Sequence, residues 1–157
     1  MIKRLAKSIR EYKKESILTP VLVALEVVME VIIPLLMAKL IDDGIYAGSM
    51  NEVVKLGVEL LIAAALSLIF GVLSGAVAAK ASAGFAKNLR KDLYYKVQDF
   101  SFSNIDKFST SSLVTRLTTD VTNVQNAFQM IIRIAVRTPL MLVFSLIMAF
   151  NINKELS

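Results

Sequence analysis

The sequence predicts an all-α membrane protein with three long transmembrane helices, two of which extend into the cytoplasm as a helical hairpin. The 157 residues are 55% hydrophobic, above the roughly 45–50% that is usual for soluble domains. The apolar residues gather in three blocks, each long enough for the roughly 20 residues that a helix needs to cross a bilayer. Between the second and third blocks the sequence becomes charged but keeps a helical period of apolar residues.

The composition excludes several kinds of site. The chain has no Cys and no His, so a disulfide framework, thiol chemistry and a His-based acid–base or metal site are excluded. We expect no catalytic residues, no metal ligands and no cofactor in this chain, since it also lacks a phosphate-binding loop. The net charge is +5, and its distribution along the chain is more informative than its sum.

Residues 1–16 are basic and amphipathic. Six of them are Lys or Arg, and the apolar Ile2, Leu5, Ala6 and Ile9 recur at helical spacing. This pattern predicts an amphipathic elbow helix on an anionic membrane surface, with a disordered basic tail as the alternative. The segment is too charged, and too long before the first apolar run, for a cleavable signal peptide.

Three spans follow from the apolar blocks, at residues 17–41, 53–80 and 131–150. Pro20 and Pro34 fall within the first span, and membrane helices tolerate proline where neighbours satisfy the freed carbonyl. We expect residues 42–52 to form an extracellular loop, with Gly44 as the C-terminal cap of the first helix. Residues 151–157 are expected to be a truncated extracellular end.

The second span carries small residues at every fourth position. Such a row lets a neighbouring helix approach closely, because lipid supplies no hydrophobic drive for helix association. Ser67, Gly71 and Gly75 are the central candidates for helix packing. The full row is Ala63, Ser67, Gly71, Gly75, Ala79 and Ala83.

The helical pattern continues beyond the second span into a predicted cytoplasmic excursion at 81–130. One helix over 53–100 would be about 70 Å long, whereas the hydrocarbon core is about 30 Å thick, so some 30–40 Å would project from the membrane. A polar interruption at 101–112 is typical of turns and caps, and a second amphipathic helix then returns. The apolar stripes are Phe85, Leu89, Leu93, Val97 and Phe100 before the interruption, and Leu113, Leu117, Val121, Val124, Phe128 and Ile131 after it.

Positive charge predicts the orientation in the membrane. The first 16 residues hold six cations, the 42–52 loop holds none, and the 80–116 stretch holds seven. The positive-inside rule then places the N-terminus and the excursion in the cytoplasm and the C-terminus outside. Three spans, an odd number, put the two termini on opposite sides of the membrane, which agrees with the charge distribution. We therefore expect a multi-pass protein of the plasma membrane.

Glu26 and Glu30 are the strongest candidates for a site within the bilayer. They lie four residues apart, on one face of the first span and close to its midpoint. A charged side chain at that depth costs about 2.5–3.5 kcal/mol on insertion scales. Two alternatives remain open: the acids line a translocation cavity and attract a cationic substrate, or they pair with helices that this chain lacks.

The excursion contains the residues that identify a family. The stretch FSNIDKFSTSSLVTRLTTDVTNVQNAF resembles the first intracellular loop of ATP-binding-cassette (ABC) exporters. The pattern is matched by Phe108, Leu113, Thr115, Arg116, Leu117, Asp120 and Val121. The basic N-terminal helix, PLLMAKLIDDGI in the first span and RTPLMLVFSLIMAFNIN in the third also agree, so the resemblance covers essentially the whole chain. It is nearest to one subunit of bacterial heterodimeric multidrug exporters.

Two departures from the family pattern stand out. Many members have Gly-Asp or Gly-Glu where this sequence has Ser111-Ser112. Members also have six spans and then a nucleotide-binding domain, whereas this chain ends after the third span and contains no G-x-x-x-x-G-K-[ST] phosphate-binding loop. The sequence is therefore expected to be a fragment of the membrane domain, and not itself an enzyme.

The resemblance implies a mechanism and a set of partners. It implies a coupling helix near 103–112 that contacts the nucleotide-binding domains of an ATP-hydrolysing translocase, which bind ATP and Mg. Partners would be the lipid bilayer, the remaining helices, those domains and a second subunit, with no nucleic acid. The coupling residues would be Asn104, Ile105, Asp106, Lys107 and Phe108, although Phe108 could instead cap the hairpin's own core. A small membrane scaffold or regulatory protein is the alternative function.

Overall fold

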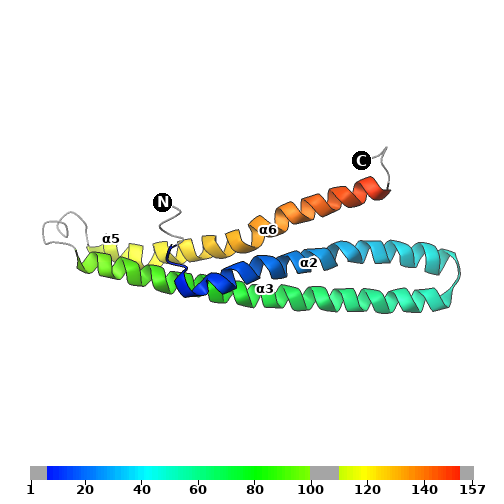
Figure 1. Cartoon of the computed structure of the whole chain (residues 1–157), viewed down its shortest axis with the longest axis horizontal. Helices are drawn as coiled ribbons and strands as arrows, with labels where there is room; N and C mark the ends of the chain where they lie inside the picture. Colours follow the sequence, from blue (N-terminus) through cyan, green and yellow to red (C-terminus); the bar gives the residue numbers. More distant parts are fainter. Residues whose placement is uncertain (1–6, 100–109, 153–157) are drawn as a thin grey trace.

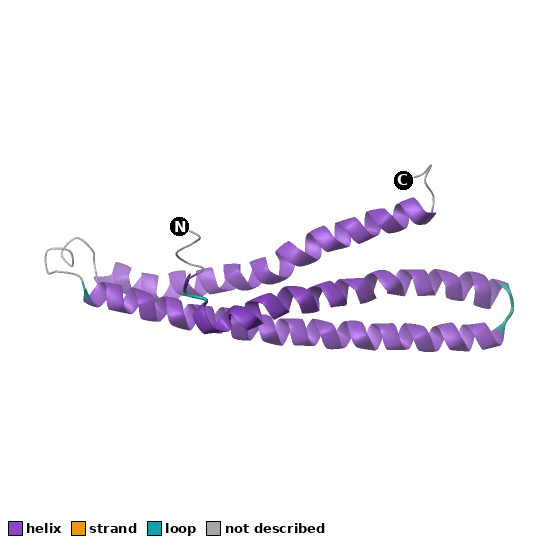
Figure 2. Ribbon diagram, in the orientation of Figure 1, coloured by secondary structure: helices purple, strands orange, loops and turns teal. Residues whose placement is uncertain are grey.

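The computed structural model describes residues 7–99 and 110–152, and every regular element in these ranges is a helix (Figure 2). The predicted all-α class is confirmed. In chain order the elements are the 3-10 helix η1 (Arg10–Tyr12), α2 (Lys13–Lys39), the π-helix η2 (Leu40–Tyr46), α3 (Met50–Gln98), α5 (Thr110–Thr115), the π-helix η3 (Arg116–Asp120) and α6 (Val121–Ile152).

The long helix α3 organises the molecule. Its 49 residues form one uninterrupted α-helix, about 70 Å long at 1.5 Å per residue. α2 packs antiparallel along its first part, and α5, η3 and the start of α6 run back along its last part (Figure 1). The prediction that the second apolar block continues as a helix beyond the bilayer thickness is therefore confirmed.

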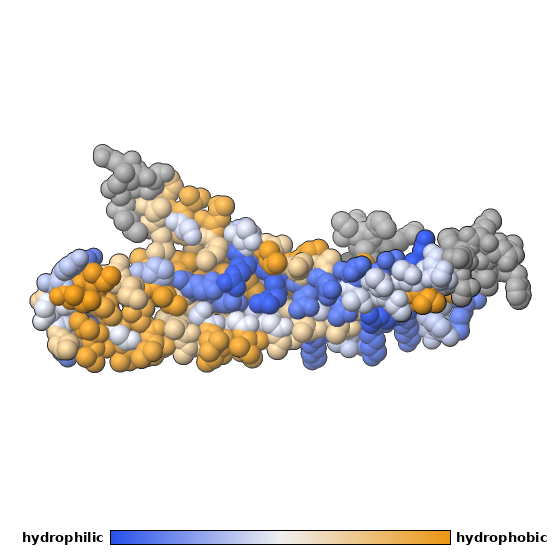
Figure 3. All heavy atoms as spheres, turned by 180° about the vertical axis from the view of Figure 1, so that it is seen from behind, coloured by the Kyte–Doolittle hydropathy of each residue, from blue (hydrophilic) through white to orange (hydrophobic). Residues whose placement is uncertain are grey.

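Three helices in the described ranges are long and apolar enough to cross a membrane, within Arg10–Tyr46, Met50–Gln98 and Ser111–Phe150. Large aliphatic side chains are exposed on α2 from Ile17, on α3 up to Leu73 and on α6 from Met130. Figure 3 shows these hydrophobic atoms at the end that holds the α2–α3 connection, whereas the opposite end is hydrophilic. Exposed apolar surface of this extent belongs in lipid or against further helices.

The turn between α2 and α3 differs from the one expected. Gly48, not Gly44, has the left-handed conformation (φ 66°). The Ser49 N–H donates to the Gly44 carbonyl at 3.0 Å and the Gly48 N–H donates to the Ile45 carbonyl at 3.2 Å, the pattern of a Schellman motif. Gly44 is instead buried inside η2, where an added Cβ would lie 2.8 Å from Val53 Cγ2.

The segment before α2 lies against α3. Ser8 is buried, its Oγ donates to Asp92 Oδ2 at 2.9 Å, and its carbonyl accepts a hydrogen bond from Asn88 Nδ2 at 3.0 Å. Arg10 Nη2 donates to Asp92 Oδ1 at 2.6 Å. These four residues, Ser8, Arg10, Asn88 and Asp92, form what we call the N-terminal cluster.

The structure describes only the later part of the predicted elbow. α2 begins at Lys13, four residues before the predicted start of the span at Ile17, and it is preceded by a turn at residues 8–9 and by η1. The polar groups of Ser8 and Arg10 contact Asn88 and Asp92 on α3, so the predicted contact of the elbow with a membrane surface stays a prediction. Residues 1–6 of the predicted elbow lie outside the described residues.

The second interface joins α3 to α6. The rings of Phe85 and Phe128 stack with centroids 4.7 Å apart, and Ser82 Oγ donates to Gln129 Oε1 at 3.2 Å. The two predicted apolar stripes face each other here, and Phe85 and Val121 are fully buried. Ile131 is an exception, because it is 62% exposed and lies where α6 starts to leave α3.

The predicted row of small residues is only partly a packing surface. Gly71 and Gly75 face neighbouring helices, and Ser67 is half-buried, but Ala79 and Ala83 are exposed. A step of four residues advances about 40° beyond a full helical turn of 3.6 residues, so six such positions wind around the helix. Beyond Gly75 the buried positions shift to Ala78, Ala81, Ser82 and Phe85.

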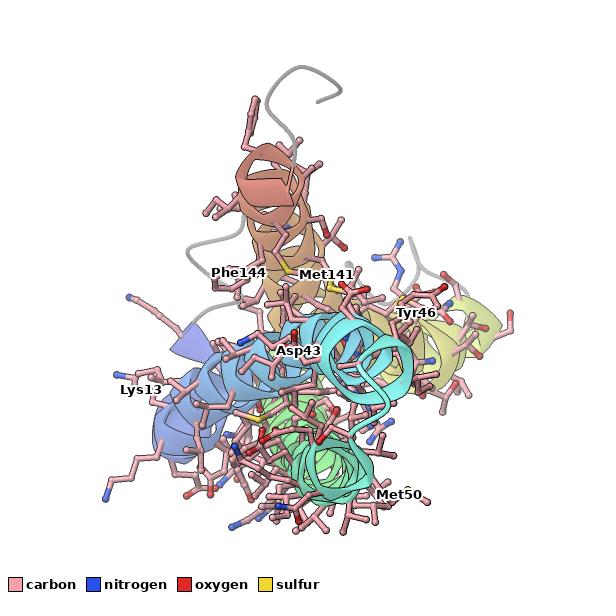
Figure 4. All side chains as sticks on the ribbon, turned by 90° about the vertical axis from the view of Figure 1, so that its right-hand side faces the viewer. Lys13, Asp43, Tyr46, Met50, Met141 and Phe144 are labelled. Atoms are coloured by element: carbon pink, nitrogen blue, oxygen red, sulfur yellow. The ribbon has the colours of Figure 1, made fainter. Side chains whose placement is uncertain are left out.

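Towards its C-terminal end α6 diverges from the other two helices (Figures 1 and 4). Figure 4, viewed from the α2–α3 connection, shows Met141 and Phe144 on α6 well away from Met50 on α3. Leu142, Leu146 and Phe150 are all at least half exposed. Together with the exposed Met141, Val143 and Ile147, these side chains give this half of α6 apolar surface on more than one face.

A glycine substitution tests the contact between the N-terminal segment and α3. A Cβ at Gly84 would overlap the ring of Tyr12, whereas a Cβ at Gly57 would meet no atom within 4 Å. In the complete transporter that contains this segment, Gly84→Ala should cost about 1–3 kcal/mol through overpacking and lower the apparent melting temperature in neutral detergent.

Gly57→Ala is the matched control and should leave that temperature unchanged or raise it, because Ala favours a helix over Gly by about 1 kcal/mol. Adding Tyr12→Ala to Gly84→Ala should recover part of the loss. Equal effects of the two glycine substitutions would contradict the packing described here.

Candidate functional site

Arg137 connects α6 to α2 inside the apolar part of the molecule. Its Nη1 lies 2.8 Å from Glu26 Oε1 and its Nη2 lies 2.6 Å from Glu30 Oε1. The two carboxylates are one helical turn apart on the same face of α2, so a single guanidinium reaches both with its two terminal nitrogens. We call these three residues the charged triad.

α3 supports one of the two carboxylates. Glu26 is only 7% exposed, and its Oε2 accepts a hydrogen bond from Ser74 Oγ at 3.2 Å. Gly71 lies one turn before Ser74, and a Cβ there would be 3.2 Å from Glu26 Oε1. The missing side chain of Gly71 thus gives the carboxylate room between α2 and α3.

Glu30 is held less completely. Its Oε1 accepts from Arg137, but its Oε2 is buried and has no hydrogen-bond partner among the described residues. A buried acceptor without a donor costs about 1–3 kcal/mol. Glu26 is therefore the better supported of the two acids, with partners on both α3 and α6.

The charged triad explains how ionised groups are accommodated at this depth. Intramembrane charges normally face the bundle interior and pair with one another, and all three members lie between helices. Paired charges that also satisfy each other's hydrogen bonds avoid most of the cost of an isolated ion in a low-dielectric environment. The triad therefore fixes which face of α6 meets α2.

A hollow of about 500 Å³ lies between α2 and α6 beside the triad. Its polar lining comes from Asn126, Gln129, Arg133 and Arg137 on α6. Its apolar lining comes from Val23, Met130 and Ile134. In Figure 3 a hydrophilic patch lies where α6 leaves the other helices, between the hydrophobic and hydrophilic ends of the molecule.

The structure places the predicted acids in an ion pair between helices. Glu26 and Glu30 are not among the side chains that line the hollow; they contact Arg137 instead. Of the two alternatives left open, the ion pair between helices is the one found, but its cation comes from α6 of this chain and not from helices that the chain lacks. Sequence reasoning missed Arg137 as that partner, although a cation six residues into the third apolar block was an available signal.

The predicted packing residues have different neighbours. Gly71 lies against Glu26, and Gly75 lies near Arg133, whose Nη1 is 3.9 Å from the position of an added Cβ. Ser67 is half-buried on α3. Two of the three thus lie beside charged side chains of adjacent helices, so their small size also makes space for polar groups.

The predicted coupling residues Asn104, Ile105, Asp106, Lys107 and Phe108 lie outside the described residues. The helices on either side of them are described. α3 ends at Gln98 and α5 begins at Thr110, so the predicted coupling element connects the ends of two adjacent antiparallel helices.

Comparison with known proteins settles the family. Residues 16–157 match the ABC transporter transmembrane region. The chain belongs to this family. As an ABC transporter transmembrane region it is the membrane part of a transporter and not a nucleotide-binding domain, and the charged triad lies among its membrane helices.

Relatives of this ABC transporter transmembrane region include proteins of three bacterial genera. It is 39% identical over 136 residues to the uncharacterized ABC transporter ATP-binding protein YfiB of Bacillus subtilis, a match that covers 87% of this chain and 24% of the relative. It is 26% identical over 153 residues to the uncharacterized ABC transporter ATP-binding protein MT1311 of Mycobacterium tuberculosis, covering 98% of this chain and 26% of the relative.

A third relative is the putative ABC transporter ATP-binding protein MG014 of Mycoplasma genitalium, 27% identical over 112 residues, with 71% of this chain and 18% of the relative covered. The chain thus spans about a quarter of the length of the first two relatives. The three described membrane helices are consistent with a multi-pass membrane protein.

Removing Arg137 alone from the charged triad should destabilise the protein more than removing all three charges. Arg137→Gln leaves the buried Glu26 and the half-buried Glu30 without a cation, and we expect it to cost about 3–5 kcal/mol. Glu30→Gln should cost least, because Glu26 keeps both Arg137 and Ser74. The apparent melting temperature of the complete transporter in neutral detergent measures this order.

The triple variant, with Gln at positions 26, 30 and 137, should recover much of the loss caused by Arg137→Gln, because no charge remains buried. Arg90→Gln is the control, since Arg90 is exposed and its Nη2 donates a hydrogen bond to Thr122 Oγ1. If Arg137→Gln were no more destabilising than Arg90→Gln, the triad would not hold α6 to α2.

Proposed function

We propose that this chain forms the first half of the membrane domain of an ATP-driven ABC exporter, with the far end of the α3 hairpin as its contact to the nucleotide-binding domains. The observation that carries this proposal is the length of α3. Its large exposed aliphatic side chains end at Leu73, with only the amphipathic Tyr94 and Tyr95 exposed beyond it, but the helix continues to Gln98, roughly 38 Å further. A paired helical arm of that length provides a rigid connection between the bilayer and a soluble domain.

The distribution of charge supports a cytoplasmic position for this arm. The stretch from Lys80 to Arg116 carries seven cations, whereas the α2–α3 connection carries none. Under the positive-inside rule the arm and the N-terminus lie in the cytoplasm and the C-terminus outside. ATP is available only on the cytoplasmic side, so this orientation suits a contact with ATP-binding domains.

Contacts on the described part of the arm support rigid transmission. The stacked pair Phe85 and Phe128 joins α3 to α6, and the N-terminal cluster joins the start of the chain to Asn88 and Asp92. The salt bridge from Glu15 to Lys80 adds a contact between α2 and α3 at 2.9 Å. Motion at the tip of the arm would then reach α2 and α6 together.

The remaining parts of the transporter are proposed from the family. ATP and Mg would be bound by nucleotide-binding domains outside this chain. Three further membrane helices and a second subunit, in a heterodimer, would complete the translocation cavity. The exposed apolar half of α6 is available for contact with those helices.

Cysteine cross-linking tests the position of the coupling element. This segment contains no cysteine, so single cysteines can be placed at Lys107, in the predicted coupling element, and at Met50, in the α2–α3 connection. In membrane vesicles that contain the complete transporter, a linker reactive towards thiols and amines should join position 107 to the nucleotide-binding domain, with a yield that changes when ATP is added.

Position 50 is the control and should give no such product, because it lies at the opposite end of α3. Cross-linking of position 50, or none at position 107 and its neighbours Ile105 and Phe108, would contradict the proposed contact.

A further inference from the structure

The hollow between α2 and α6 has a surplus of hydrogen-bond donors. Gln129 Oε1 already accepts from Ser82 Oγ at 3.2 Å, so its amide nitrogen is the part of the group that remains available. Arg133 has no hydrogen-bond or ion-pair partner in the part of the chain that the structure describes, and a guanidinium is donor only. Both side chains line the hollow.

Arg133 is half-buried between α6 and α3. Its Nη1 is 3.9 Å from the position that a Cβ on Gly75 would occupy, so Gly75 leaves room for the guanidinium against α3. An arginine without a partner at the edge of the apolar zone is costly. A planar guanidinium there is suited to a carboxylate or a phosphate, which it can bind with two parallel hydrogen bonds.

The acids of the charged triad do not use this donor capacity. Glu26 and Glu30 are bound by Arg137 through both of its terminal nitrogens. The four charges of Glu26, Glu30, Arg137 and Arg133 balance, yet Arg133 donates no hydrogen bond to either acid. The N–H groups of Arg133 are therefore available to a ligand, and the nearest carboxylates are already satisfied by another cation.

The rest of the lining is apolar. Val23 is buried on α2, and Met130 and Ile134 flank Arg133 on α6, each more than half exposed. A ligand whose charged group contacts Arg133 would meet these side chains with its remaining part. A volume of about 500 Å³ is within the range of sites for small organic molecules, roughly 300–1,000 Å³.

We propose that this hollow binds the anionic group of an amphiphile, with its carboxylate or phosphate on Arg133 and Gln129 and its apolar part on Val23, Met130 and Ile134. The inference rests on the proposed export function, because it names the class of compound that this part of the cavity takes. An exported amphiphilic anion and an anionic lipid share this chemistry. The site prefers anions over cations, in contrast to the cationic substrate that Glu26 and Glu30 suggest from sequence alone.

Binding to the complete transporter in dodecyl maltoside tests the proposal. An environment-sensitive fluorophore on a cysteine placed at Asn126, an exposed residue in the lining of the hollow, reports the binding of dodecanoate, dodecyltrimethylammonium and phosphatidylglycerol, each added separately. Dodecanoate should bind at least about tenfold more tightly than dodecyltrimethylammonium, a factor that corresponds to about 1.4 kcal/mol. Arg133→Gln should weaken dodecanoate binding about tenfold, and Arg133→Lys should retain part of it.

Lys55→Gln is the control, because Lys55 lies on α3 near the α2–α3 connection and pairs with Glu52; it should leave dodecanoate binding unchanged. If phosphatidylglycerol binds in an Arg133-dependent manner and dodecanoate does not bind, the hollow is a lipid site. If dodecanoate binds in an Arg133-dependent manner and phosphatidylglycerol does not, the hollow is a site for a free amphiphile. Both outcomes support the proposal. Equal affinity for the two dodecyl compounds, or dodecanoate affinity unchanged by Arg133→Gln, would overturn it.

Two measurements separate this proposal from the general export function. If Arg133→Gln prevents assembly of the transporter, the comparison of anion and cation in the unchanged protein still decides the preference. Cross-linking at position 107 tests the contact with the nucleotide-binding domain without any amphiphile. If position 107 does not cross-link but the transporter still prefers dodecanoate, only the coupling role is rejected. If position 107 cross-links but dodecanoate is not preferred, only the anion site is rejected.

Discussion

The unbroken hydrogen bonding of α3 is the constraint on which the rest of the structure depends. A helix satisfies its own backbone groups both in lipid and in water, so one helix can cross the bilayer and continue beyond it. α2, α6 and the N-terminal cluster all pack on α3, and Gly71, Ser74 and Gly84 on this helix determine where the others approach. A break in α3 at the membrane surface would separate the site between α2 and α6 from the tip of the hairpin.

The charged triad provides the specific contact within this frame. Apolar side chains of α2 and α6 would pack in many rotational settings, since lipid competes equally for them. The Arg137 guanidinium must reach two carboxylates, which restricts α6 to one rotation about its axis. Ser74 and Gly71 fix the position of the Glu26 carboxylate. The hollow beside Arg133 lies between α2 and α6, on the N-terminal side of Arg137 along α6. The same pairing that neutralises the acids thus leaves Arg133 available to a ligand.

The sequence predicted the class, the number of long helices and the facing stripes around Phe85 and Phe128, because each depends on local periodicity and composition. It did not predict contacts that depend on helix rotation. Six small residues at four-residue steps suggested one continuous packing surface. Each such step rotates about 40° around the helix axis beyond a full turn, so Ala79 and Ala83 are exposed. Arg137 was not recognised as the partner of Glu26, because a single sequence does not show which residues of two helices lie at the same height along their axes. The left-handed residue that caps the first long helical segment is Gly48 and not Gly44, because the π-helix η2 continues that segment from Leu40 to Tyr46.

A distance between spin labels at Asn51 and Lys96 tests the central claim most directly, that α3 is one helix longer than the bilayer is thick. In the complete transporter, reconstituted in lipid nanodiscs, we expect a narrow distance distribution centred at about 68 Å, from 45 residues at 1.5 Å each. A water-soluble relaxation agent should reach the label at position 96. A distance below about 50 Å, or a label at 96 that only lipid-soluble oxygen reaches, would contradict the account.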